Sequence, residues 1–198
     1  MNQDQITGII LCGGESSRMG ADKGLVAFHG APLILHAINL LMPTCHDLII
    51  CSNNPEYERF GIRVQPDLIG HIGPMGGIYS GLIASSTPDN LVLSCDMPLI
   101  TTPMIRLLLK HRSARKITIP VHPSKRVEPL FGIYPFEFIE QLRESIENGK
   151  LGISDFFNRV PVCYLEIGKH PDVFHSDAFF NINTPTDLAK AEVLYRKY

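Results

Sequence analysis

The feature that most constrains the fold is a continuous apolar run, residues 6–11, that leads directly into a glycine-rich loop. An apolar run of this length without polar alternation is typical of a parallel strand covered on both faces. Gly13 and Gly14 permit positive φ angles and let backbone N–H groups approach an anion closely. The same loop contains Arg18 and Lys23, which can neutralise a phosphate. The strand and the loop together predict a phosphate-binding site.

This loop matches neither of the two common nucleotide-binding motifs. No G-x-x-x-x-G-K-[ST] pattern of a P-loop and no G-x-G-x-x-G dinucleotide fingerprint can be written through it. The alternative interpretation is a glycine-rich surface turn with two solvated basic residues. The position directly after a strand and the presence of two cations favour the phosphate site.

Strand and helix patterns alternate along the 198 residues. Apolar runs typical of strands cover residues 47–52 and 90–95, and helical spacing of apolar residues covers 32–42 and 136–148. A strand is also expected within residues 129–134. This alternation predicts an α/β domain built around a mostly parallel sheet, and the length favours one domain.

Three helix ends carry capping signals. Thr102 is expected to be an N-cap because Pro103 follows it, and Gly149 is expected at the C′ position after the helix of residues 136–148. Thr184, followed three residues later by Asp187, predicts a capping-box-like start of the last helix.

Composition and charge exclude several classes of protein. The net charge of −2 provides no general attraction for nucleic acid or an anionic membrane, so a small phosphate ligand is favoured. No signal peptide and no apolar run of membrane-spanning length is found. Five scattered cysteines without a C-x-x-C pair indicate free thiols, and we expect a cytoplasmic protein without a structural metal site.

Polar side chains follow three of the predicted strands. The glycine-rich loop follows Leu11, Asn53 follows the run 47–52, and Asp96 follows the run 90–95. Phosphate ligands of parallel α/β folds bind at the carboxyl ends of the strands, where these residues are expected to meet. A carboxylate there can hold Mg²⁺ together with substrate phosphates. The alternative for Asp96 is that it only caps the following turn.

Asp67 is a candidate for base recognition. It precedes the glycine cluster of residues 70–77, whose glycines permit close approach of a flat base. Its carboxylate can accept from the N1–H and N2–H₂ donors of guanine, whereas cytosine lacks that paired donor edge. The alternative is a loop aspartate without a ligand.

Asn181 and Asn183 alternate on a segment that is expected to be extended, so both side chains share one face. Two amides on one face before a helix can recognise a second polar substrate, and the alternative is turn and capping chemistry. Cys12 and Cys95 lie near the predicted phosphate site. We assign no chemistry to these thiols, because a small buried residue is the commoner role of cysteine.

Five motifs resemble those of the nucleotidyltransferases related to molybdenum cofactor guanylyltransferase. Residues 11–23 read L-C-G-G-x-S-x-R-M-G-x-D-K, which is similar to the family signature L-A-G-G-x-S-x-R-M-G-x-D-K. The similarity continues, in the family's order, with the segments Q-P-D (65–67), G-P-M-G-G (73–77), C-D-M-P (95–98) and N-I-N-T-P (181–185).

The resemblance implies a Rossmann-like three-layer αβα sandwich of the nucleotide-diphospho-sugar transferase type. It implies transfer of GMP from GTP to the terminal phosphate of molybdopterin or Mo-molybdopterin, with Mg²⁺ as cofactor and with cofactor-handling proteins of the same pathway as partners. One domain, 1–198, would comprise a nucleotide-binding half of about residues 1–100 and an acceptor-binding half of about residues 101–198.

The resemblance also implies roles for individual residues. The GTP site would be formed by Leu11, Cys12, Gly13, Gly14, Lys23, Asn53, Asp67 and Asp96. The residues implied in catalysis are Arg18, Lys23 and Asp96. Asp96 would also bind Mg²⁺, and Asn181 and Asn183 would face the acceptor.

The chain departs from the family pattern at three places. Cys12 replaces the usual Ala, the segment 73–77 replaces G-P-L-A-G, and residues 128–131 lie where some members have a His-Pro pair. The alternatives are a cytidylyltransferase for the same cofactor and a sugar-phosphate nucleotidyltransferase. A catalytically silent nucleotide- or molybdopterin-binding module is the alternative from a different class.

Overall fold

A seven-stranded sheet organises the molecule, and its strand order is β5-β4-β1-β6-β8-β7-β9. The structure, a computed structural model, describes residues 6–13, 22–70 and 72–197. Its sheet strands are β1 (Ile6–Leu11), β4 (Asp47–Cys51), β5 (Arg63–Gln65), β6 (Asp89–Ser94), β7 (Ile117–Val121), β8 (Phe131–Pro135) and β9 (Val162–Glu166). β8 runs antiparallel to its neighbours β6 and β7, and the other neighbouring strands pair in parallel.

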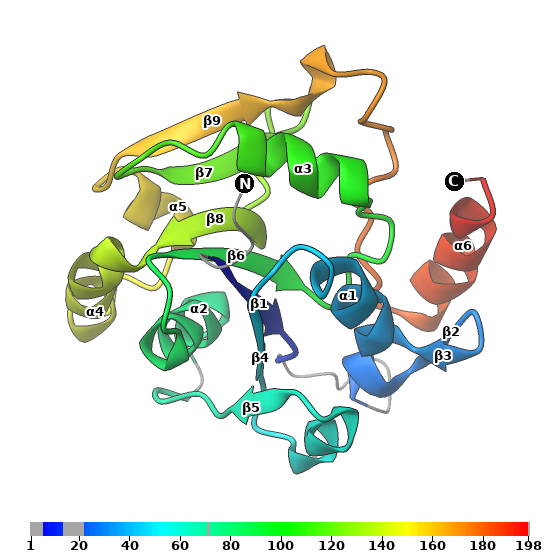
Figure 1. Cartoon of the computed structure of the whole chain (residues 1–198), viewed down its shortest axis with the longest axis horizontal. Helices are drawn as coiled ribbons and strands as arrows, with labels where there is room; N and C mark the ends of the chain where they lie inside the picture. The colour runs from blue at the N-terminus through cyan, green and yellow to red at the C-terminus, as the bar shows by residue number, and fades with distance from the viewer. Residues whose placement is uncertain (1–5, 14–21, 71, 198) are drawn as a thin grey trace.

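Helices lie on both faces of the sheet (Figure 1). The α-helices are α1 (Leu33–Leu41), α2 (Pro74–Ala84), α3 (Thr102–Lys110), α4 (Ile139–Glu147), α5 (Ile153–Phe157) and α6 (Pro185–Tyr195). Short 3₁₀ turns are η3 (Lys23–Leu25), η4 (Pro55–Phe60), η5 (Phe136–Phe138) and η6 (Ile167–Lys169). α1 and α3 cover one face, and α2, α4 and α5 cover the other. The expected mostly parallel three-layer αβα sandwich is therefore confirmed.

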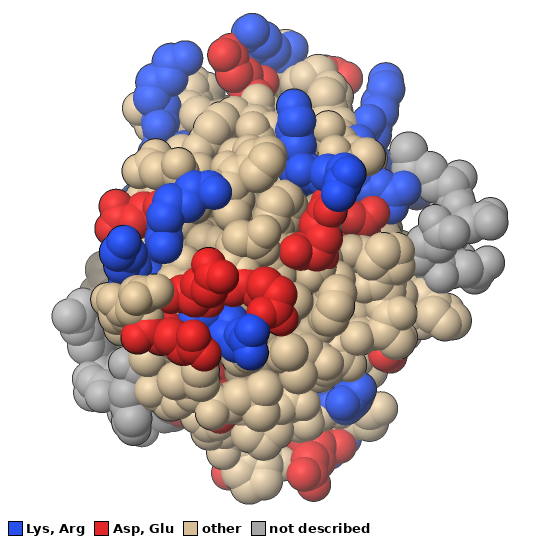
Figure 2. All heavy atoms as spheres, turned by 90° about the vertical axis from the view of Figure 1, so that its left-hand side faces the viewer, with Lys and Arg blue, Asp and Glu red and all other residues tan. Residues whose placement is uncertain are grey.

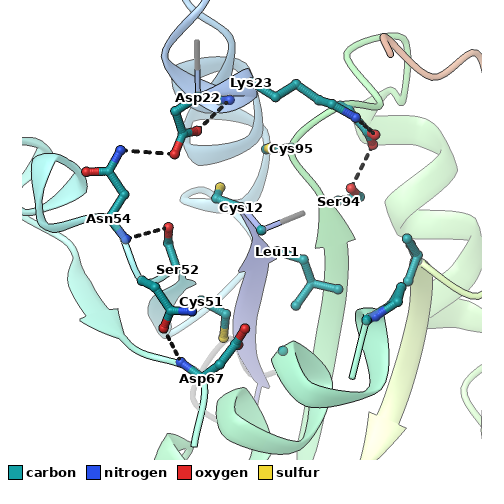
Figure 3. Close-up of a pocket in the computed structure, with 18 of the residues that line it drawn as sticks. Leu11, Cys12, Asp22, Lys23, Cys51, Ser52, Asn54, Asp67, Ser94 and Cys95 are labelled. Carbon is teal, nitrogen blue, oxygen red and sulfur yellow. Dashed lines mark hydrogen bonds and ion pairs between the residues drawn. The ribbon is translucent and has the colours of Figure 1, made fainter. Parts of the chain in front are cut away.

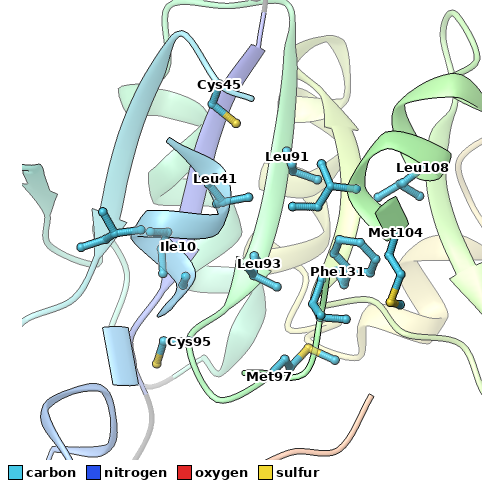
Figure 4. Close-up of a cluster of buried hydrophobic side chains, with 14 of the residues drawn as sticks. Ile10, Leu41, Cys45, Leu91, Leu93, Cys95, Met97, Met104, Leu108 and Phe131 are labelled. Carbon is cyan, nitrogen blue, oxygen red and sulfur yellow. The ribbon is translucent and has the colours of Figure 1, made fainter. Parts of the chain in front are cut away.

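Alternate residues of β1 supply the two faces of the core. Ile10 packs in the cluster beneath α1 and α3, whereas Ile9 and Leu11 pack in the cluster beneath α2 and α4. Figure 4 shows the first cluster, where Ile10 and Leu41 lie near Leu91. Full burial of one such side chain contributes roughly 1.5–3 kcal/mol. Burial on both faces explains why the run shows no polar alternation.

The ends of three strands meet at one edge of the sheet. β1 lies between β4 and β6, and the register pairs Leu11 with Cys51 on one side and with Ser94 on the other. All three strands run in the same direction, so the segments that follow them lie side by side. Within the described residues, the prediction that Asn53 and Asp96 lie near the segment after Leu11 is confirmed, because they line one cleft together with Cys12 and Gly13.

A hairpin and the C-terminal helix form a separate small cluster. β2 (Ala27–Phe28) and β3 (Ala31–Pro32) pair antiparallel, and α6 lies beside them (Figure 1). Phe28 packs there with Ile182 and Ala191. The N–H of Ile182 also donates to the Asp96 carbonyl at 3.0 Å. This packing brings the segment around residue 182 to the edge where β1, β4 and β6 end.

Several predicted boundaries differ from the structure by one or a few residues. The N-cap of α3 is Thr101 and Thr102 is already helical, so the predicted cap was wrong by one position. The helix expected over residues 136–148 begins instead as the 3₁₀ turn η5 and continues as α4, and the strand expected over 129–134 begins only at Phe131. Gly149 has the expected positive φ, +67°.

The predicted capping pattern of α6 is present, with one difference. The Thr184 hydroxyl accepts from the Asp187 N–H at 3.1 Å. The Asp187 carboxylate in turn accepts from the Thr184 hydroxyl at 2.9 Å and from the Asn183 N–H at 3.1 Å. In a standard capping box the side chain at N3 accepts from the N-cap N–H, whereas here the bond from the Asn183 N–H comes from the residue before the N-cap.

The face that carries α4 presents mixed charge among its described residues. Figure 2 shows Lys and Arg side chains distributed over this face among Asp and Glu side chains. α4 itself exposes Glu140, Glu144 and Glu147 beside Arg143, which pairs with Glu140. Among the described helices, none is long and apolar enough to cross a membrane.

Candidate active site

A cleft of about 690 Å³ opens at the edge where β1, β4 and β6 end (Figure 3). The residues that line it are Leu11, Cys12, Gly13, Asp22, Lys23, Gly24, Cys51, Ser52, Asn53, Asn54, Asp67, Gly70, Gly73, Pro74, Gly77, Ser94, Cys95, Asp96 and Leu130. A volume of this size is typical of a small-molecule site.

The cleft brings together most of the residues singled out from the sequence. Seven of them line it: Leu11, Cys12, Gly13, Lys23, Asn53, Asp67 and Asp96. Gly14 and Arg18 lie outside the described residues. Asn181 and Asn183 are not part of the lining, although Asn183 reaches a lining residue through its side chain.

Lys23 and Asp96 form an ion pair in the cleft. The Lys23 ammonium lies 3.0 Å from Asp96 Oδ2, and it also donates to Asn183 Oδ1 at 2.8 Å. The other carboxylate oxygen of Asp96 accepts from the Ser94 hydroxyl at 2.7 Å. Both charged side chains are largely covered, with 22% and 15% exposure. The pair therefore connects the loop after β1, the end of β6 and the segment that precedes α6.

A second network surrounds Asp22, a residue that the sequence reasoning missed. Its Oδ1 accepts from the Gly24 N–H at 3.2 Å and from the Tyr57 hydroxyl, and its Oδ2 accepts from Asn54 Nδ2 at 3.0 Å. Burial and the nearby carboxylate raise the pKa of Tyr57 well above its usual value, so its hydroxyl stays protonated. Asp22 and Asn54 are the sequence neighbours of Lys23 and Asn53, so their position next to predicted site residues could have identified them. No pattern in the sequence indicates Tyr57.

Asn53 and Asp67 meet at the opposite end of the cleft. Asn53 Oδ1 accepts from the Asp67 N–H at 2.9 Å, so the amide fixes the backbone that carries the carboxylate. Burial raises the pKa of Asp67. A Cβ at Gly77 would lie 3.1 Å from Leu11 Cδ2, too close for an ordinary contact. Glycine at this position therefore lets α2 approach the end of β1 closely.

The thiols in the cleft are buried. Cys12, Cys51 and Cys95 are free cysteines with little exposure. Burial, followed by the neighbouring Cys95, raises the pKa of Cys12, and burial together with Asp67 raises that of Cys51 to about 12. A protonated thiol is a poor nucleophile. The raised pKa of Cys12 therefore agrees with the assignment of no chemistry to this thiol.

The segment of residues 128–131, which departs from the family pattern, lies at the cleft and at the start of β8. Leu130 lines the cleft, and its carbonyl accepts from the Ser94 N–H at 2.9 Å. Glu128 is buried and pairs with Arg126, whose Nε lies 2.6 Å from Oε1. Burial raises the pKa of Glu128, and Arg126 partly opposes this effect.

The donor set at Asp96 fits a divalent ion that is shared with a phosphate. Among the described residues no group of three or more His, Cys, Asp or Glu side chains is arranged to hold a metal. Mg²⁺ does not require such a group, because it binds through one or two carboxylates with waters and substrate phosphates. The ammonium at 3.0 Å from Asp96 demonstrates that this carboxylate is placed to attract a cation.

The fold and the cleft define a nucleotidyltransferase. The solved structure of the molybdopterin-guanine dinucleotide biosynthesis protein A from Archaeoglobus fulgidus superposes with a TM-score of 0.83 at 25% identity, covering 97% of this chain and 100% of that one. A 2-C-methyl-D-erythritol 4-phosphate cytidylyltransferase from Thermus thermophilus shares the fold, with a TM-score of 0.67 at 17% identity over 97% and 99% of the two chains.

Sequence comparison identifies the family within this class. The family model described as the MobA-like NTP transferase domain matches residues 8–162, and the chain belongs to this family. A probable molybdenum cofactor guanylyltransferase from Flavobacterium johnsoniae is 38% identical, over 93% of this chain and 95% of that protein. The molybdenum cofactor guanylyltransferase from Vibrio cholerae is 28% identical, over 94% and 91%.

Proposed function

We propose that this protein transfers GMP from GTP to the terminal phosphate of molybdopterin or Mo-molybdopterin and releases pyrophosphate. The observation that carries the proposal is the arrangement of the cleft, with Lys23 and Asp96 at one end and Asn53 and Asp67 at the other. Relatives named as guanylyltransferases over more than 90% of the chain support the same substrate pair.

The reaction is an in-line displacement at the α-phosphorus of GTP. An oxygen of the acceptor phosphate forms a bond to the α-phosphorus, and the bond to the oxygen that bridges to the β-phosphorus breaks. The electron pair of that bond leaves with pyrophosphate. Because the attacking phosphate is already ionised, no general base is needed. Catalysis then depends on positioning the two substrates and stabilising their negative charge.

We propose that the loop after β1 holds the triphosphate. Lys23 and Arg18 would neutralise the departing pyrophosphate, and the backbone of residues 11–14 would approach the phosphates. Glycine at positions 13 and 14 removes the side chains that would otherwise block this approach.

Base selection is assigned to the other end of the cleft. Asp67 would accept from N1–H and N2–H₂ of guanine, and Asn53 would keep the carboxylate in place through its bond to the Asp67 N–H. Cytosine presents no such pair of donors. The arrangement therefore favours GTP over CTP.

Asp96 would hold Mg²⁺ in the loaded enzyme. When bound, this ion supplies positive charge at the phosphates during transfer. The protein's own part is to present the carboxylate: the Ser94 hydroxyl holds one oxygen at 2.7 Å, which leaves the other directed at Lys23.

The acceptor is assigned to the C-terminal half of one domain, about residues 101–198, and the nucleotide to about residues 1–100. Asn181 and Asn183 would contact the acceptor, since Asn183 reaches Lys23 at 2.8 Å while its segment comes from the C-terminal half. We also propose a cytoplasmic location and exchange of the acceptor with cofactor-handling proteins, because five free cysteines suit a reducing compartment.

The test is incubation of the protein with each of the four NTPs, Mg²⁺ and molybdopterin, with pyrophosphate as the measured product. We expect pyrophosphate release with GTP but with none of the other three NTPs, and only when the acceptor is present. Release from CTP would indicate the cytidylyltransferase, and release with a sugar phosphate as acceptor would indicate the sugar-phosphate enzyme. Binding of nucleotide and acceptor without release would indicate a silent binding module.

A further inference from the structure

We infer that Asp22 is a positioning residue: held by Tyr57 and Asn54, it fixes the turn that carries Lys23 and thereby aims the ammonium at the phosphates. The inference rests on the proposed role of Lys23 as a phosphate ligand. It adds three residues to the site, and none of the three was recognised from the sequence.

The Asp22 carboxylate is engaged at both oxygens. Oδ1 accepts from the Gly24 N–H at 3.2 Å and from the Tyr57 hydroxyl, and Oδ2 accepts from Asn54 Nδ2 at 3.0 Å. Three donors on one carboxylate leave it little capacity to act as a further ligand of a cation or substrate. A carboxylate held in this way serves as an anchor for the backbone on either side of it.

The anchor acts directly on the turn that contains Lys23. Asp22 is the N-cap of η3, which begins at Lys23, and its carboxylate satisfies the N–H of Gly24 in that turn. Because Lys23 has four rotatable side-chain bonds, a fixed Cα position reduces the entropy that is lost when the ammonium binds. From this fixed Cα position the Lys23 side chain extends to Asp96 and Asn183, which its ammonium contacts.

Packing makes the anchor rigid. The Tyr57 side chain is fully buried, and its phenol lies against Gly24, so that a Cβ at this glycine would collide with the phenol oxygen. Burial and the surrounding groups raise the pKa of Tyr57, which keeps its hydroxyl a donor. The turn therefore rests on a side chain that is itself immobilised in the core.

The same strand end also reaches the base side of the cleft. Asn54 bonds Asp22 (Figure 3), whereas its neighbour Asn53 accepts from the Asp67 N–H at 2.9 Å. The Asn54 N–H in turn donates to the Ser52 hydroxyl at 3.2 Å, which fixes the segment after β4. Two adjacent asparagines thus connect the phosphate end and the base end through one short piece of backbone.

The test separates phosphate positioning from general damage by comparing GTP with GMP. Equilibrium affinities of the full chain for both nucleotides are measured by calorimetry for wild type, Tyr57→Phe, Asn54→Ala, Lys23→Ala and the double variant Tyr57→Phe/Lys23→Ala. GMP lacks the two phosphates that Lys23 would contact. We expect Tyr57→Phe and Asn54→Ala to weaken GTP binding about tenfold, the effect of one hydrogen bond to a charged group, and to leave GMP binding unchanged.

The double variant tests whether the anchor acts through Lys23. In the Lys23→Ala background, Tyr57→Phe is expected to have no further effect on GTP binding, since residues that act as a unit are not additive. Tyr134→Phe is the matched control: it removes another buried phenol hydrogen bond, from Tyr134 to the Pro129 carbonyl, and is expected to lower thermal stability without changing either affinity. Circular dichroism confirms that each variant is folded.

The other outcomes distinguish failure of the positioning role of Asp22 from failure of the proposed phosphate contact of Lys23. Equal losses for GTP and GMP, or full additivity with Lys23→Ala, would overturn the positioning role of Asp22 while leaving that of Lys23 intact. Unchanged GTP affinity in Lys23→Ala itself would instead reject the proposed phosphate contact, and the positioning role would fail with it.

Discussion

The proposed nucleotide side and the proposed acceptor side of the cleft are built differently. On the nucleotide side, Asp22, Asn53 and Asp67 are held by hydrogen bonds that join the turn η3, the segment after β4 and the segment before α2. On the acceptor side, Asn183 is exposed and reaches the cleft through its bond to Lys23, while the neighbouring Ile182 anchors the segment. The first side is a preformed network, and the second is a single extended segment.

This difference indicates how the two substrates are selected. A preformed network loses little entropy when its ligand binds, so it suits a ligand recognised by fixed polar groups. The acceptor segment belongs to the packing of α6 on the β2–β3 hairpin, which lies outside the main core. We therefore expect substitution of the charged pair on the nucleotide side to have a larger effect than substitutions on the acceptor side. The first two of the following three predictions test this order, and the third tests Asp67 through pH.

The largest effect is expected at the Lys23–Asp96 pair. Lys23→Ala and Asp96→Ala are each expected to lower kcat about a hundredfold or more, the typical cost of removing one electrostatic group from a preorganised site. Steady-state pyrophosphate release measures this loss. Both side chains line the cleft, so each variant should remain folded, and removal of one member of this largely covered ion pair is expected to lower the thermal unfolding temperature. Near-normal turnover in either variant would reject the assignment.

An intermediate effect is expected on the acceptor side. Asn183→Ala and Asn181→Ala are each expected to raise KM for the acceptor by about tenfold, as for the loss of one hydrogen bond to a charged phosphate. The two variants should differ in their KM for GTP, because Asn183 contacts the Lys23 ammonium at 2.8 Å. Only Asn183→Ala is expected to change KM for GTP. If neither substitution alters KM for the acceptor, the placement of that substrate is wrong.

The smallest effect is expected from pH at Asp67. Burial raises the pKa of this carboxyl above its usual 3.8, so it becomes protonated at a higher pH than an ordinary aspartate. GTP affinity should therefore fall by a few-fold on acidification toward this range, and the fall should be absent in Asp67→Asn, which binds more weakly at neutral pH. The difference between wild type and variant removes the titration of the nucleotide phosphates from the comparison.

Acid unfolding caused by Asp67 does not account for the expected fall in GTP affinity at low pH. Because its folded pKa lies above the unfolded value, the contribution of Asp67 to stability is largest at low pH and decreases as pH rises from 3.8 through the folded pKa. Protonation of Asp67 therefore does not itself destabilise the fold.

A GTP affinity of the wild-type protein that stays constant with pH would contradict a role for the ionised Asp67 carboxylate in binding.

The sequence predicted the architecture because its signals are local. The uninterrupted apolar run Ile6–Leu11 indicates a strand buried on both faces, and the polar residues that follow three such runs meet because parallel strands end at one edge. The predicted positions of helix ends were less accurate. Thr101 and Thr102 are both β-branched hydroxyl residues before Pro103, so the sequence alone does not distinguish which of them is the cap.

The missed residues are those that depend on long-range contacts. Tyr57 lies 35 positions from Asp22, and the contact between them becomes apparent only when η4 packs beside η3. The bond between Lys23 and Asn183 spans 160 positions and requires α6 to return to the hairpin. Such pairings follow from the tertiary fold, and no local pattern in the chain specifies them.

The ion pair between Lys23 and Asp96 would couple the two proposed ligands of the cleft. The two side chains balance each other, so a phosphate that attracts the ammonium would leave the carboxylate with an uncompensated negative charge. A cation bound to the carboxylate would in turn free the ammonium for the phosphate. Under the proposed roles, each ligand would therefore promote the binding of the other, and by linkage the gain in affinity would be the same for both.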